Sequence, residues 1–117
     1  MDWIKIFQNT SEANSVLTEN KLKLLVVRGK RICITRHEGK ILAVQDKCTH
    51  NGESLSKGII NYLGEVVCPW HGYRFNLKTG REGSQQSRDL ECYPIKENEE
   101  GVFIGVKPLI QNSTLPI

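Results

Sequence analysis

Apolar and polar residues alternate along most of the chain in short runs, and this pattern predicts β-strands joined by turns. Six segments share it: residues 3–7, 24–27, 31–36, 41–45, 93–97 and 102–106. Between the third and fourth segments, Gly39 can take the positive φ that a tight hairpin requires. The pattern is typical of an all-β domain, an antiparallel β-sandwich or barrel.

One short helical turn is expected among these strands. Asn9 is followed three positions later by Glu12, the spacing of a capping box, so the turn should run to about Leu17. With 117 residues the chain has the length of one domain. The segment from about 108 to 117 is expected to be a loosely held tail.

Residues 46–80 break the strand rhythm and hold two unusual pairs of residues. Cys48 and His50 form C-T-H, and Cys68 and His71 form C-P-W-H, with seventeen residues between the pairs. Each pair supplies one thiolate and one imidazole. This division suits a binuclear cluster in which one iron takes both cysteines and the other takes both histidines. A short strand pair is expected around Gly64, between the two motifs.

The same four residues leave a second interpretation open. Two cysteines and two histidines are also a common ligand set for one structural zinc ion. Zinc motifs, however, usually pair like with like, a Cys-Cys knuckle followed by a histidine pair three to five residues apart. The mixed pairs therefore favour the iron–sulfur interpretation over the zinc one.

The stretches K-C-T-H-N-G-E-S-L-S-K-G at 47–58 and V-C-P-W-H-G-Y-R-F-N-L-K-T-G at 67–80 resemble the Rieske family. The resemblance implies one Rieske (ISP-like) domain over residues 1–117, with a cluster-binding subdomain inserted at about 46–80. It also implies one [2Fe–2S] cluster per chain, with Cys48, His50, Cys68 and His71 as cofactor and metal ligands.

The residues around the motifs place the chain within that family. High-potential relatives carry an extra cysteine in each loop, and the matching positions here are Glu53 and Trp70, which cannot form a disulfide. Tyr73 and Phe75 match the serine and tyrosine whose hydroxyls lie near the cluster in those relatives. Phe75 has no hydroxyl to donate, so the potential should lie in the lower part of the range of about −150 to +300 mV.

The resemblance implies a one-electron carrier of the soluble ferredoxin branch. Its expected partners are a flavin-dependent ferredoxin reductase and a terminal oxygenase or reductase subunit. The carrier would be a non-catalytic component of a dioxygenase-type system, with no catalytic residue of its own. Because small or polar residues flank His50 and His71, the outer edges of both imidazoles should reach the surface.

Other functions remain to be weighed against this one. A complete Rieske oxygenase needs two further histidines for its mononuclear iron, and only His37 is left. The small subunit of an assimilatory nitrite reductase has a related fold and is an alternative, although it often lacks the cluster ligands. A zinc-stabilised binding module without redox activity is a third.

Composition excludes two classes of partner. A net charge of +3, with acidic residues interspersed, does not favour nucleic acid. The sequence contains no signal-like segment and no apolar run near the roughly 20 residues of a membrane span, so no membrane association is expected. Cys33 and Cys92 are interpreted as buried, unpaired thiols, which predicts a cytoplasmic protein.

Overall fold

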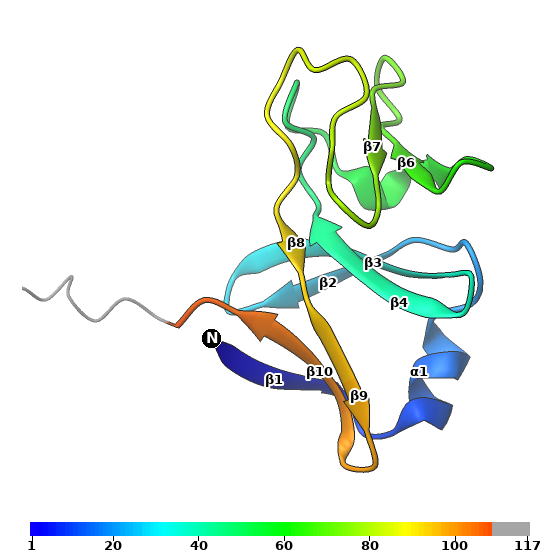
Figure 1. The fold of residues 1–117 in the computed structure, drawn as a ribbon, viewed down its shortest axis with the longest axis vertical. Coiled ribbons are helices and arrows are strands. Elements are labelled where there is room, and N and C mark those ends of the chain that lie inside the picture. Colours follow the sequence, from blue (N-terminus) through cyan, green and yellow to red (C-terminus); the bar gives the residue numbers. More distant parts are fainter. Residues whose placement is uncertain (109–117) are drawn as a thin grey trace, which may run out of the picture.

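The computed structural model describes residues 1–108, and they fold into three stacked antiparallel sheets (Figure 1). The lower sheet has the order β1-β10-β9, formed by β1 (Asp2–Phe7), β10 (Gly101–Val106) and β9 (Ile95–Asn98). It joins the N-terminal strand to the C-terminal hairpin. The tail predicted at about 108–117 lies outside the described residues, apart from its first position.

The middle sheet has the order β2-β3-β4-β8. Its strands are β2 (Lys23–Val27), β3 (Lys30–His37), β4 (Lys40–Gln45) and β8 (Cys92–Tyr93). Arg28-Gly29 and Glu38-Gly39 form its two-residue turns, and all four residues have positive φ. Such turns match the right-handed twist of the flanking strands, so the meander closes without splaying.

Both faces of the middle sheet are buried. Side chains on one face pack with the lower sheet, and those on the other face pack with the upper sheet. For this reason residues 32–34 of β3 are all apolar. The face toward the lower sheet carries Ile32, Ile34, Ile41 and Ala43; the opposite face carries Cys33 and Val44. The expected sandwich is therefore confirmed, with an additional layer above it.

The predicted helical turn is helix α1 (Thr10–Val16). Asn9 caps it, because its Oδ1 accepts a hydrogen bond from Glu12 N at 2.8 Å. The Glu12 carboxylate reaches back to Gln8 N at 2.8 Å, which satisfies a second free donor at the helix start. Ala13 and Leu17 bury this segment against the core between the lower and middle sheets.

The upper sheet consists of three short strands in the order β5-β6-β7. The strand pair around Gly64 is confirmed as β5 (Ile59–Ile60) and β6 (Glu65–Val67), preceded by the 3-10 helix η1 (Leu55–Lys57). The third strand, β7 (Arg74–Asn76), was not expected. The chain also stays in this layer beyond residue 80.

Residues 81–91 lie against the upper sheet. Glu82 forms a β-bridge with Phe75, and Leu90 N donates to Gly80 O at 2.8 Å. The segment that leaves the scaffold therefore covers residues 46–91, which we call the insert. The scaffold is the remainder, residues 1–45 and 92–108.

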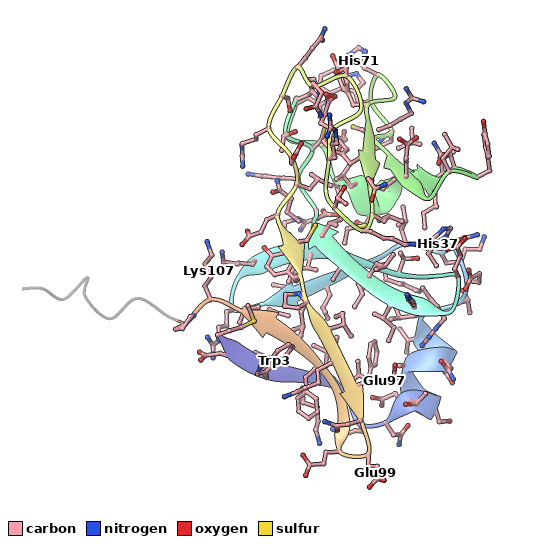
Figure 2. The ribbon with its side chains drawn as sticks, in the orientation of Figure 1. Trp3, His37, His71, Glu97, Glu99 and Lys107 are labelled. Atoms are coloured by element: carbon pink, nitrogen blue, oxygen red, sulfur yellow. The ribbon has the colours of Figure 1, made fainter. Side chains whose placement is uncertain are left out.

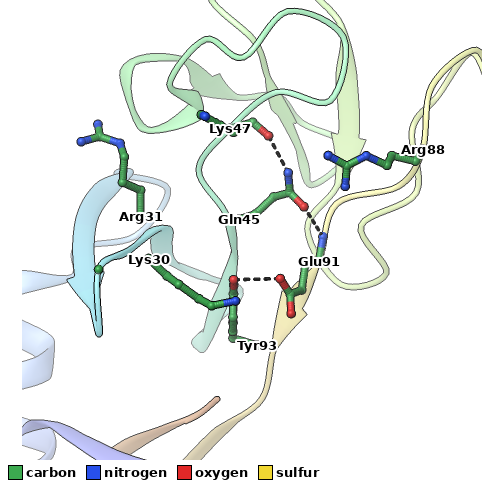
Figure 3. Close-up of a pocket in the computed structure, with 8 residues that line it drawn as sticks. Lys30, Arg31, Gln45, Lys47, Arg88, Glu91 and Tyr93 are labelled. Carbon is green, nitrogen blue, oxygen red and sulfur yellow. Dashed lines mark hydrogen bonds between the residues drawn. The ribbon is translucent and has the colours of Figure 1, made fainter. Parts of the chain in front are cut away.

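The two ends of the insert lie next to each other, and Gln45 links them by hydrogen bonds (Figure 3). Gln45 N donates to Glu91 O, and Glu91 N donates to Gln45 Oε1, each at 2.8 Å. The Gln45 amide also donates to Lys47 O at 2.8 Å. The Gln45 side chain thus contacts the backbone at both the start and the end of the insert.

The strand predicted at 93–97 is wrong as a single element. Tyr93 pairs with Ala43 in the middle sheet, whereas β9 pairs with β10 in the lower sheet. Pro94 lies between them, and it lacks the N–H needed to continue a ladder. The chain changes sheets at this residue. No helix in residues 1–108 has the length and apolar character needed to cross a membrane.

Candidate metal centre

The insert carries all four predicted ligand residues, and His71 lies near its end farthest from the lower sheet (Figure 2). Cys48 and His50 lie in the loop that follows β4, and Cys68 and His71 lie in the loop between β6 and β7. The sequence separates the motifs, and the insert folds them into two facing loops. His37, the remaining histidine, lies at the β3–β4 hairpin, away from both (Figure 2).

Both cysteines are buried and lie beside each other. Cys48 is 3% exposed and Cys68 is 1% exposed, and the Cys48 side chain is within hydrogen-bonding reach of the Cys68 thiol. Burial raises the pKa of Cys68, and Cys48 raises it further, against a lowering contact from the Trp70 backbone. Thiolates here therefore need positive charge beside the sulfurs, which ferric irons would supply.

The first ligand loop is held by Asp46, which is fully buried. Its Oδ1 accepts from Ser56 N at 2.8 Å, and its Oδ2 accepts from the Ser54 hydroxyl at 2.5 Å. Within the loop, Cys48 N donates to Glu53 O at 2.9 Å. These bonds hold the backbone on either side of Cys48.

The second ligand loop has an unusual backbone. His71 has a φ of 74°, and Gly72 follows with a φ of 71°. The left-handed conformation costs a residue other than glycine roughly 1 kcal/mol or more, and such residues cluster at functional sites. The Cys68 N to Tyr73 O hydrogen bond at 2.8 Å closes the turn. The strain falls on a predicted ligand.

Asn51 joins the two loops. Its amide nitrogen donates to Trp70 O at 3.2 Å, and its Oδ1 accepts from Glu53 N at 2.9 Å. The same Oδ1 lies 3.7 Å from the Cys68 sulfur, within reach of a thiol donor. One side chain thus links the backbone of one loop to the thiol of the other.

The two histidines lie in different surroundings. The His50 side chain is 12% exposed, and its ring stacks face to face on Tyr73, with centroids 3.4 Å apart. His71 is exposed and packs beside Trp70, with ring centroids 4.9 Å apart. The expectation that imidazole edges reach the surface is confirmed for His71. It is wrong for His50, whose Nε2 is buried because the Tyr73 ring and the Glu82 segment cover it.

Glu82 is a functional candidate that sequence reasoning missed. It is 1% exposed, and its Oε2 lies 3.4 Å from His50 Nε2. Burial alone would raise its pKa, but hydrogen bonds from Ser84 and Gln86 and the contact with His50 lower the pKa to about 2. The surrounding residues, E-G-S-Q-Q-S, are typical of a solvated loop, so the sequence carries no signal of this burial.

Two further cysteines were expected to be buried. This is confirmed for Cys33, which is 1% exposed, and burial raises its pKa to about 12. It is wrong for Cys92, which is exposed because β8 is an edge strand of the middle sheet. All four cysteines are unpaired thiols.

These residues fit a two-iron cluster in their donor chemistry. Two buried thiols from different loops lie beside each other, and each loop also carries one imidazole. The buried His50 Nε2 has no hydrogen-bond partner, because Glu82 lies outside hydrogen-bond geometry. Within residues 1–108, no group of three or more His, Cys, Asp or Glu side chains is placed to hold a single metal ion. Gly52 and Gly72 have positive φ with open space around them, so backbone conformation favours glycine there.

A separate cavity of about 350 Å³ lies beside the first ligand loop, around the Gln45 contact (Figure 3). Four cationic side chains line it: Lys30, Arg31, Lys47 and Arg88. Arg31 contacts the buried Asp46 at 3.5 Å. The four predicted ligands lie outside this cavity, so it is distinct from the candidate centre.

Comparisons with known proteins identify the family of the chain. The family model of the Rieske [2Fe-2S] domain matches residues 7–94. The ferredoxin component of naphthalene 1,2-dioxygenase/salicylate 5-hydroxylase systems from a Ralstonia species is 35% identical over 82 residues, which are 69% of this chain and 78% of the relative.

Two solved structures share the fold. The ferredoxin of carbazole 1,9a-dioxygenase from Nocardioides aromaticivorans IC177 has a TM-score of 0.77 at 17% identity, covering 92% of this chain and all of that one. A chain in a complex of reduced oxygenase and oxidized ferredoxin in carbazole 1,9a-dioxygenase has a TM-score of 0.72 at 24% identity, covering 87% of this chain and 100% of that chain. The expected fold class is confirmed.

Proposed function

Because the chain belongs to the Rieske [2Fe–2S] domain family, we propose that it is a one-electron carrier whose cluster is held by Cys48, His50, Cys68 and His71. The family has one [2Fe–2S] cluster per domain, which takes up and releases one electron when bound. Two ferric ions, two sulfides and two thiolates sum to zero charge. Neutral imidazoles on the second iron add no charge to that sum. A neutral cluster would accept an electron more readily than an all-cysteine cluster, which carries a negative charge.

The observation that supports the proposal most directly is the contact between Cys48 and Cys68. Both are buried, they come from different loops, and each has a histidine two or three positions later. The sulfurs face the apolar core that contains Phe75 and Val66, while His71 lies at the surface. The chain would therefore exclude water from the thiolate side and expose one imidazole.

The proposed partners are a flavin-dependent ferredoxin reductase as donor and a terminal oxygenase as acceptor. The relative reported above is a ferredoxin component of dioxygenase systems, and one similar structure is a complex of ferredoxin and oxygenase. Trp70 is 54% exposed beside His71, which offers such a partner an apolar contact at the exposed ligand. We place this exchange in the cytoplasm.

Metal analysis and electron paramagnetic resonance of the purified protein test the cluster. We expect two irons and two acid-labile sulfides per chain, visible absorption, and paramagnetism only in the reduced protein. Cys48→Ser and His71→Ala should lose the cluster, because each removes one of the four predicted ligands. Cys92→Ser and His37→Ala are matched controls outside the site and should retain it.

One zinc ion per chain without visible absorption would show that the zinc-stabilised module is the correct interpretation. Electron transfer assays test the partners. The reduced protein should transfer electrons to a dioxygenase terminal component, and the Trp70→Ala variant should do so more slowly at an unchanged midpoint potential. Stable association with an assimilatory nitrite reductase, and no transfer to an oxygenase, would favour the small-subunit alternative.

A further inference from the structure

The two predicted histidine ligands differ in one respect that the ligand set does not explain: a buried carboxylate lies against one of them. Glu82 Oε2 is 3.4 Å from His50 Nε2, whereas His71 packs beside Trp70 at the surface. Glu82 is not a predicted ligand, and the electron-carrier function does not require it. Its position therefore needs a separate explanation.

The Glu82 carboxylate is held in place by its own segment. It accepts hydrogen bonds from Ser84 N at 2.8 Å, from the Ser84 hydroxyl at 2.5 Å and from Gln86 N at 3.1 Å. Glu82 N donates to Asp89 Oδ1 at 3.0 Å, which closes the segment on itself. The charge is thus fixed beside His50 by donors that belong to the protein.

The His50 ring is also fixed. Its stacking on Tyr73, with an interplanar angle of 6°, leaves it little freedom to rotate. Its Nε2 is buried and lacks a hydrogen-bond partner, and the Glu82 carboxylate lies 3.4 Å from it. A small adjustment of either side chain would convert the contact into a hydrogen bond.

An ionised carboxylate only accepts hydrogen bonds, so the His50 nitrogen that faces it must carry the ring proton. The hydrogen bond made by one ring nitrogen decides which nitrogen binds a metal. With the proton on Nε2, the lone pair of Nδ1 is left for iron. A carboxylate acceptor also makes the imidazole a stronger donor of electron density.

We propose that Glu82 is a positioning residue for His50: it holds the ring proton on Nε2 and lowers the midpoint potential of the cluster. The inference rests on the proposed function. It makes the two imidazoles unequal, one buried and joined to a fixed negative charge, the other exposed.

The experiment compares the midpoint potentials of three single variants with that of the wild type, each loaded with its cluster. Glu82→Gln removes the charge and keeps the shape of the side chain. Glu53→Gln removes a carboxylate charge from the first ligand loop without a contact to histidine. Ser84→Ala removes a hydroxyl that holds Glu82 and leaves its charge, so it reports a merely structural effect.

We expect Glu82→Gln to favour the reduced state about tenfold, a rise of about 59 mV for a one-electron couple. Glu53→Gln and Ser84→Ala should change the midpoint much less. Pulsed electron paramagnetic resonance of the reduced protein resolves the nitrogens bound to iron. In Glu82→Gln the hyperfine coupling of the His50 nitrogen should change, while that of the His71 nitrogen stays the same.

An unchanged midpoint in Glu82→Gln, or an equal rise in Ser84→Ala, would overturn the inference. If Glu82→Gln cannot hold the cluster, Glu82→Asp decides, because it keeps the charge: a retained cluster with a nearly normal midpoint supports the role, and its loss refutes it. A wild-type protein without iron would refute the proposed function itself. A loaded protein with no response to Glu82→Gln would refute only the role of Glu82.

Discussion

The scaffold and the insert are stabilised in different ways. In the scaffold, long strands with regular alternation bury aliphatic side chains between the lower and middle sheets. In the insert, strands of two or three residues contribute few ladder bonds, and side chains from carboxylates and amides satisfy the loop backbone instead. Asn61 and Asn76 each accept two backbone N–H bonds at turns, as Glu82 does near the predicted ligands. Asp46 accepts one backbone N–H and one hydroxyl.

This difference has a functional reason. A ligand loop must hold its backbone in one conformation while leaving space for a cluster, so it cannot fill its centre with apolar side chains. Polar side chains that bond to the backbone supply this rigidity from the periphery. The chain has one tryptophan in each region, Trp3 in the scaffold and Trp70 in the insert, so the two can be followed separately by fluorescence.

The largest effect is expected from the apolar centre of the insert. Phe75 is fully buried in the same core cluster as the two cysteines predicted as ligands. Phe75→Ala should lower the free energy of unfolding by about 3–5 kcal/mol, measured by urea denaturation. Trp70→Ala, at an exposed position of the same unit, should cost less than about 1 kcal/mol. Equal losses would contradict the view that the insert has a real core of its own.

Acid should affect the insert first. Despite burial, which raises it, hydrogen bonds from Ser84 and Gln86 bring the pKa of Glu82 from the ordinary 4.5 to about 2. The stability from this ionised group is therefore complete above about pH 4.5 and is lost as the pH falls toward 2. In a Trp3→Phe variant, the Trp70 fluorescence should report this loss. Glu82→Gln should abolish this part of the pH dependence.

Alkali should affect the scaffold. Burial and, after it, the neighbouring Glu91 carboxylate together raise the pKa of Tyr93 from 10.0 to about 12. The folded protein then retains a proton that the unfolded chain has lost, so stability falls as the pH rises from 10 to about 12. Trp3 fluorescence in a Trp70→Phe variant should report this loss of stability. Tyr93→Phe should remove the transition, and an unchanged transition would contradict the assignment.

The smallest effect should be the same in both regions. Gly39 in the scaffold and Gly52 and Gly72 in the insert have positive φ and open space around them. Alanine at any of them should cost about 1 kcal/mol, because only the backbone conformation is penalised. Thermal unfolding of the three variants measures it. A much larger loss at Gly52 or Gly72 would show that the insert depends on backbone geometry more than the scaffold does.

The same contrast explains what could be predicted from the sequence. Strand alternation and the Asn9 cap are local signals, so the meander, the helix and the C-terminal hairpin were expected correctly. The ligand positions follow from residue types and spacing, and they remain a prediction for metal analysis. Pro94 was a visible signal for the change of sheet, but the alternation around it hid the break.

The contacts that distinguish His50 from His71 could not be predicted in this way. Glu82 lies 32 positions after His50, in a polar stretch that has the composition of an exposed loop. Its burial depends on how residues 81–91 fold back along β7, which no periodicity encodes. The exposure of Cys92 depends likewise on which strand ends the middle sheet.

The Gln45–Glu91 junction has a consequence for how such a chain can change in length. The hydrogen bonds at this junction hold the two ends of the insert together. The insert therefore behaves as one closed loop, whose entropy of closure depends only weakly on its length. Each doubling of a flexible loop costs only about 0.6 kcal/mol more. Residues can therefore be added to or removed from the outer loops, which reshapes the surface offered to a partner. The six residue pairs of β3 and β4 beneath keep their register.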